Sequence, residues 1–166
     1  MIEHIANPLL ALSEWVRVLM ENGILLLIFP HKDGTFDHKR QVTSLSHLIK
    51  DCEQKTNEDD LTHLPEILER HDFKKDPGIE SAEAFKKRSE HNYENRCLHH
   101  HVFDTSLVIE IVHHLDLQII DVEPLLPSDI LIIARKVQAG NLPNNDKYFV
   151  NDAKYRHTSP FISDRH

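Results

Sequence analysis

The feature that most constrains the fold is the apolar run Ile24–Phe29 (ILLLIF), which follows Gly23 directly and stops at Pro30. Six apolar residues without polar alternation are typical of a strand that is covered on both faces, as in a parallel sheet between helices. A helix that ends in glycine and leads at once into such a strand indicates an α/β fold.

A helix is predicted just before this strand. Asn7 can cap its first turn, and Pro8 suits the first helical position. Apolar residues recur at i, i+3, i+4 and i+7, which predicts one buried stripe that includes the only tryptophan: Leu12, Trp15, Val16 and Leu19. Gly23 is expected to end the helix as its C′ residue.

Five further parts are expected along the chain. We expect a helix over 43–52, and then a polar helical insertion over 53–103, because α/β units need only 2–6 residues between elements. Asp104 is positioned to cap a further helix. Two short apolar strands follow, over 118–123 and 130–134, and their short connection makes them antiparallel neighbours. The polar tail 138–166 is expected to be ordered only if it docks.

Composition excludes several classes of protein. One domain is expected from 166 residues, and 19 basic against 27 acidic residues (net charge −8) argue against a nucleic-acid binder. No stretch is long and apolar enough to span a membrane, and the opening MIEHIANPLL does not resemble a signal peptide. The two distant cysteines, Cys52 and Cys97, favour a reduced, cytoplasmic setting. The four glycines are isolated, so a glycine-built phosphate cradle is excluded.

Four segments resemble the carboxyl-terminal half of class I S-adenosylmethionine-dependent methyltransferases: Glu3–Pro8 (EHIANP), Asn22–Leu27 (NGILLL), Phe29–Asp37 (FPHKDGTFD) and 118–136. The resemblance covers about residues 1–137. It implies a partial Rossmann-like methyltransferase fold with a three-stranded mixed sheet, an antiparallel carboxyl-terminal hairpin and a helical insertion. Its strand order places Ile24–Phe29 at one edge of the sheet.

The same resemblance implies methyl transfer from S-adenosylmethionine to a small or glycan-linked acceptor, with cofactor contacts at Glu3 and His4. The family's glycine-rich loop is not present in this sequence, so the domain is expected to be truncated and inactive or incomplete alone. An open, apolar sheet edge invites pairing, which predicts a homo-oligomer or a complementing amino-terminal half. The alternative function is a non-catalytic interaction protein or a His-rich metal-binding protein on a methyltransferase remnant.

The loop after the apolar run contains the candidate catalytic residues. Histidine is suited to take the proton of a hydroxyl acceptor, so His31 is the candidate base, and Asp33 or Asp37 is expected to orient it. His38 flanks the same loop. The alternative is a solvated loop whose charges face water.

Fourteen histidines, about 8% of the chain, suggest a divalent metal such as zinc. On a predicted 60–71 helix, His63 and His71 lie about 80° apart and could approach one site. His99 and His101 point to one face of an extended segment. These four are the candidate ligands, and the alternative is that they are ordinary buried or exposed histidines.

Overall fold

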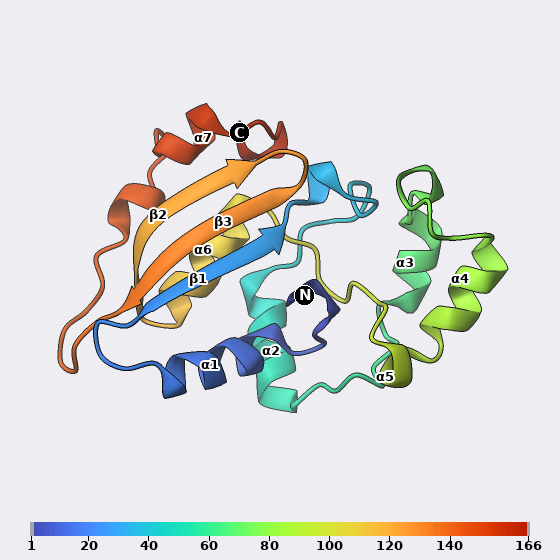
Figure 1. Ribbon diagram of the computed structural model, residues 1–166, viewed down its shortest axis with the longest axis horizontal. Helices are drawn as coiled ribbons and strands as arrows, with labels where there is room; N and C mark the ends of the chain where they lie inside the picture. Colours follow the sequence, from blue (N-terminus) through green and yellow to red (C-terminus); the bar gives the residue numbers. More distant parts are fainter. Residues whose placement is uncertain (1, 166) are drawn as a thin grey trace.

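The computed structural model describes residues 2–165 and has a mixed α/β fold (Figure 1). Within these residues it has seven α-helices: α1 (Pro8–Val18), α2 (Leu45–Gln54), α3 (Leu64–Arg70), α4 (Ala82–Ser89), α5 (Asn92–Asn95), α6 (Thr105–His114) and α7 (Lys154–Thr158). The strands are β1 (Ile24–Pro30), β2 (Leu117–Leu125) and β3 (Asp129–Lys136). They form one open sheet.

The sheet has the order β1-β3-β2, and β3 pairs antiparallel with both neighbours. Ile132, for example, lies opposite Leu27 on one side and Val122 on the other. The expected antiparallel hairpin and the edge position of β1 are confirmed. The expected mixed sheet is wrong at the level of pairing, because β1 and β2 run in the same direction but β3 separates them.

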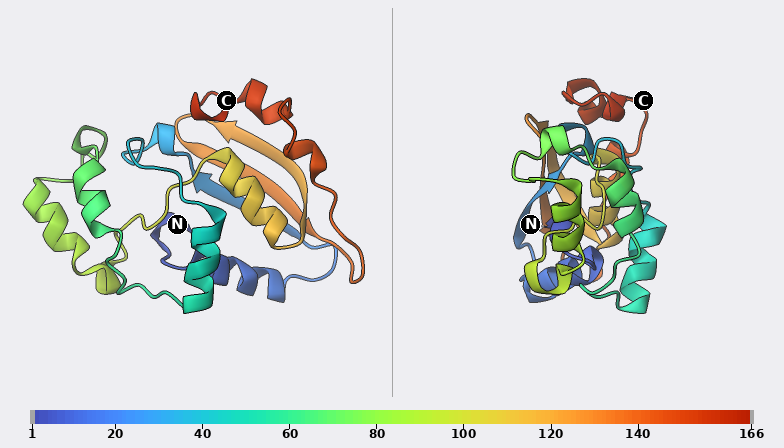
Figure 2. Two further views of the ribbon diagram at one scale, coloured as in Figure 1. Left: turned by 180° about the vertical axis from the view of Figure 1, so that it is seen from behind. Right: turned by 90° about the vertical axis from the view of Figure 1, so that its right-hand side faces the viewer.

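Only one face of the sheet is covered, by α6 and the segments around it (Figure 2). On this face Phe29 and Ile132 pack with Val108 of α6 in the main core. On the opposite face of β1 three apolar side chains are more than half exposed: Ile24, Leu26 and Ile28. The prediction that this run is covered on both faces is therefore wrong, because every residue is apolar but burial alternates.

Helix α1 begins as predicted and ends early. The Leu10 amide donates to Asn7 Oδ1 at 3.1 Å, which confirms the cap. The helix stops at Val18, so Gly23 is not its C′ residue. Trp15 was expected in the core but is 39% exposed, because it lies beside a cavity next to β1.

Residues 53–103 include α3, α4 and α5, which lie beside the sheet (right of Figure 1). They have a small core of their own, made by Leu64, Ile67, Phe85 and Leu98. The Asp104 cap of α6 is confirmed, since Asp104 Oδ1 accepts from the Leu107 amide at 2.8 Å.

The last segment, 138–166, docks on the sheet as far as it is described. Tyr148 and Tyr155 join the main core, and Tyr148 Oη donates to the Ile120 carbonyl at 3.0 Å. Helix α7 packs against β2 (Figure 1).

Two further observations concern covalent links and membranes. Cys52 and Cys97 are free thiols, so no disulfide joins them. Among residues 2–165, no helix has both the length and the apolar character that crossing a membrane requires.

Candidate metal centre

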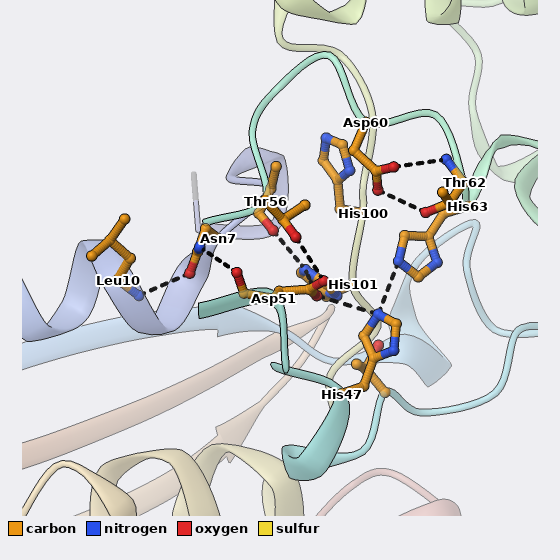
Figure 3. Close-up of polar contacts among 12 residues, drawn as sticks. Asn7, Leu10, His47, Asp51, Thr56, Asp60, Thr62, His63, His100 and His101 are labelled. Atoms are coloured by element: carbon orange, nitrogen blue, oxygen red, sulfur yellow. Dashed lines mark hydrogen bonds and ion pairs between the residues drawn. The ribbon is translucent and has the colours of Figure 1, made fainter. Parts of the chain in front are cut away.

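Three histidines and one aspartate from distant parts of the chain meet at one point (Figure 3). His47 and Asp51 are four residues apart on α2, which places them on one face of that helix. The Ser44 side chain caps α2 by accepting from the His47 amide at 3.2 Å. His63 immediately precedes α3, and His101 lies in the extended stretch that leads to α6.

Three of the distances between these groups are close to the ligand spacing of a tetrahedral ion. His47 Nε2 lies 3.1 Å from His63 Nε2 and 3.2 Å from Asp51 Oδ2, and His101 Nε2 lies 3.6 Å from the same oxygen. One ligand atom from each of the four residues lies within 4.8 Å of the others. A tetrahedral ion with zinc–nitrogen bonds of about 2.0–2.1 Å separates its ligand atoms by about 3.3 Å.

The neighbours of Asp51 hold its carboxylate in place. Asp51 Oδ1 accepts from Thr56 Oγ1 at 3.0 Å, and the Asp51 carbonyl accepts from Asn7 Nδ2 at 2.9 Å. Asp51 Oδ2, which lies toward the histidines, is buried and has no hydrogen-bond partner within residues 2–165. A buried carboxylate oxygen without a donor is costly unless a cation or proton meets it.

His101 is oriented by the backbone. Its Nε2 lies 3.0 Å from the Ala6 carbonyl, and its Nδ1 is buried without a hydrogen-bond partner in the described chain. An ion bound at Nε2 would require the ring hydrogen to be on Nδ1, so the ion would replace the contact of Nε2 with the Ala6 carbonyl.

Burial keeps the imidazoles of His63 and His101 neutral. Burial lowers the pKa of His101 to about 4. Burial, followed by the charge of His47, also lowers the pKa of His63. Since only a neutral imidazole has a lone pair to give, the ligand form of both rings is present at neutral pH.

The four predicted ligands are distributed over three places. His63 and His101 come together in the cluster above. His99 lies in a second group with Glu3 and His4. His71 belongs to neither group, and its Nε2 lies 3.1 Å from Asp76 Oδ2. The helix predicted over 60–71 spans 64–70 in the structure. His63 and His71 flank its two ends, because eight residues of helix rise about 12 Å along the axis.

The predicted catalytic residues have structural partners. His31 is fully buried and stacks on Phe161 with 3.9 Å between ring centroids. Its Nδ1 accepts from the Asp33 amide at 3.1 Å, and its Nε2 lies 3.2 Å from Asp164 Oδ1. Asp33 Oδ2 accepts from the amide and hydroxyl of Ser163.

His38 Nε2 lies 2.7 Å from Asp72 Oδ2, and His38 lines a shallow surface pocket with Asp33. Both ring nitrogens of His31 have partners, as described above, and none of these contacts adds support for catalysis. The catalytic role of His31, Asp33 and His38 stays a prediction.

His47 and Asp51 were not among the predicted ligands. The available signal was their i, i+4 spacing on a helix whose cap, Ser44, is recognisable from sequence. Their partners are 12 and 50 residues further along, and no local pattern shows that they meet.

Comparisons with family models, with curated proteins and with solved structures find no match for this chain. The geometry of the site contains possible ligands for a metal ion, and nothing in it identifies S-adenosylmethionine or a particular metal.

Proposed function

We propose that this protein is a metal-binding protein in which His47, Asp51, His63 and His101 hold one zinc ion. The observation that carries the proposal is the convergence of three imidazoles on Asp51 Oδ2, a buried oxygen with no hydrogen-bond donor among the described residues. Three nitrogens and one oxygen suit zinc, which is tetrahedral in closed sites.

The ion would act as a structural clamp. Its ligands come from α2, from the start of α3 and from the stretch before α6, so one ion would tie the helical insertion to the main core. Four protein ligands leave no open position, which favours a structural role over a catalytic one. An ion bound only by the folded state stabilises that state by mass action, by about 2.7 kcal/mol at 100 times the Kd.

The test is a zinc titration in competition with a chromophoric chelator, on the full chain without a histidine tag. Wild type is expected to hold zinc tightly at these four residues, and zinc is expected to raise Tm. Asp51→Asn and His63→Ala should each weaken this site by at least tenfold, while His114→Ala, an exposed histidine outside the cluster, should not. Equal affinity in all four proteins would contradict the proposal.

We propose, as a second candidate function, that the chain is the carboxyl-terminal part of a Rossmann-like methyltransferase domain. The observation in its favour is the strand order β1-β3-β2 with β1 at the edge, as that resemblance implies. The chain's four isolated glycines offer no loop to grip the donor, so S-adenosylmethionine binding would need a further part. Calorimetric titration with S-adenosylhomocysteine separates the cases: micromolar binding supports an assembled donor site, and no heat argues against one.

A further inference from the structure

A second group of possible ligands lies on the other side of the 99–101 stretch. Glu3 and His4 belong to the short 3-10 helix Ile2–His4, and the His100 amide donates to the Glu3 carbonyl at 3.2 Å, which holds the two segments together. The rings of His4 and His99 meet edge to face with centroids 4.7 Å apart, and His4 Nε2 lies 3.7 Å from Glu3 Oε1. One ligand atom from each of the three lies within 4.8 Å of the others.

The orientation of His99 is fixed by a buried carboxylate. His99 Nδ1 lies 2.6 Å from Asp37 Oδ2, and Asp37 Oδ1 accepts from Arg40 Nη1 at 2.9 Å. A carboxylate oxygen at this distance accepts the Nδ1 proton, which leaves the lone pair of His99 on Nε2.

This arrangement is the carboxylate–histidine pair that commonly supports a metal ligand. The Phe36 ring packs against His99 with centroids 4.6 Å apart, which further limits rotation of the imidazole. These two contacts fix the orientation of the His99 ring without any bound ion.

The group of Glu3, His4 and His99 lies beside a cavity. Glu3 and His99 line a cavity of about 530 Å³ whose other walls include Trp15, Leu26 and Ile28. Three protein ligands with space beside them are the pattern of an open zinc site, in which the remaining position takes water or an oxygen of a bound molecule.

We propose that Glu3, His4 and His99 bind a second divalent ion whose free coordination position faces this cavity. The ion would take the oxygen of a small carboxylate or hydroxyl compound, and the apolar part of that compound would lie against Trp15, Leu26 and Ile28. This proposal is independent of the closed centre, the site of His47, Asp51, His63 and His101, because the two groups share no residue.

Cobalt(II) distinguishes the two sites, since its visible spectrum reports coordination. Wild type is expected to bind two equivalents, and His4→Ala and Glu3→Gln should each bind one. His63→Ala should also bind one, at the open site. Acetohydroxamate, a small bidentate oxygen ligand, should change the cobalt spectrum of His63→Ala and leave that of His4→Ala unchanged, because only the open site can accept it.

Glu3→Gln keeps the shape of the side chain, so it guards against a loss that reflects unfolding, and circular dichroism should match wild type. Binding of as many ions by His4→Ala and Glu3→Gln as by wild type, or no response of His63→Ala to acetohydroxamate, would overturn the open site. Neither result tests the closed centre. If the closed centre does not exist, His63→Ala will bind as many equivalents of cobalt as wild type.

Discussion

Arg40 is 2% exposed, and its guanidinium joins three parts of the chain. It donates to Asp37 Oδ1 at 2.9 Å and to the carbonyls of His99 and His100 at 2.8 and 3.1 Å. Glu66 of α3 lies 3.5 Å from the same group. A buried charge that is this well partnered is expensive to remove, because its partners are left without a donor.

Arg40→Met is therefore expected to lower the free energy of unfolding by about 3–5 kcal/mol. The matched control is Arg17→Met, whose 2.8 Å pair with Glu14 is mostly exposed and should cost less than about 1 kcal/mol. Urea denaturation of the metal-free proteins measures both changes. Similar small losses in the two variants would show that Arg40 does not join these segments.

Burial lowers the pKa of His100 to about 4, and neighbouring positive charges add to the effect. The charge of Asp60 favours the charged form, but burial outweighs it. Glu58 Oε2 lies 3.7 Å from His100 Nε2, and Asn92 Nδ2 lies 2.9 Å from the same nitrogen as a donor. The unfolded ring titrates near 6.5, so between pH 6.5 and 4 the unfolded chain binds more protons than the fold.

In the metal-free protein, the contribution of His100 to the free energy of unfolding is therefore fully present above pH 6.5. It falls by about 3 kcal/mol as the pH drops toward 4. His100→Gln should flatten the dependence of unfolding free energy on pH over this range. The comparison with wild type isolates His100, because His101 titrates in both proteins. Parallel curves for the two proteins would rule out this role.

At the scale of elements, one buried aspartate joins the carboxyl-terminal segment to α6, in addition to the apolar contacts of Tyr148 and Tyr155. Asp164 is 2% exposed, and its carboxylate accepts from Thr105 Oγ1 at 2.7 Å and from Ser159 Oγ at 2.6 Å. Burial raises the pKa of Asp164, but hydrogen bonds from His31, Ser159 and Thr105 prevail and lower it. This residue ties the end of the chain to the start of α6.

Asp164→Ala is expected to destabilise the protein by about 3 kcal/mol, because several buried donors lose their acceptor. Amide hydrogen exchange should increase over 154–165 and remain slow in β3. Asp152→Ala, at an exposed position of the same segment, is the control and should change neither. Unchanged exchange in Asp164→Ala would mean that the segment is held by its apolar contacts alone.

The elements themselves were largely predictable, while their environment was not. Asn7 and Asp104 identify two helix starts from short-range chemistry, and the short 124–129 connection fixes the hairpin. The meeting of the four possible ligands was not predictable, since His47 and His101 come together only through tertiary packing. Burial of Trp15 and of both faces of β1 was expected from apolarity, but apolarity does not show which face has a cover.

At the scale of the whole molecule, β1 has a free backbone edge and an outer face of exposed apolar side chains within residues 2–165. β1 has a pairing partner on one side only, and Ile24, Leu26 and Ile28 are 52%, 56% and 55% exposed on its outer face. Sheet edges of this kind pair with other strands. Antiparallel pairing of β1 with β1 of a second copy would extend the sheet, satisfy the backbone groups of this edge and bring these side chains beside those of the second strand.

Sedimentation equilibrium is expected to show a dimer for wild type at micromolar concentration. Leu26→Lys and Ile28→Lys should shift the protein toward monomer with an unchanged circular dichroism spectrum. Leu142→Lys, which changes an 87% exposed leucine away from the sheet edge, should leave the dimer intact. A folded monomeric wild type at all concentrations would exclude this association.

The closed metal centre is the main claim, and X-ray absorption at the zinc edge tests it most directly. The sample is zinc-loaded His4→Ala, in which only the closed centre should be filled. Three imidazole nitrogens and one carboxylate oxygen at about 2.0–2.1 Å are predicted. A shell dominated by water oxygens, with one imidazole or none, would contradict the account.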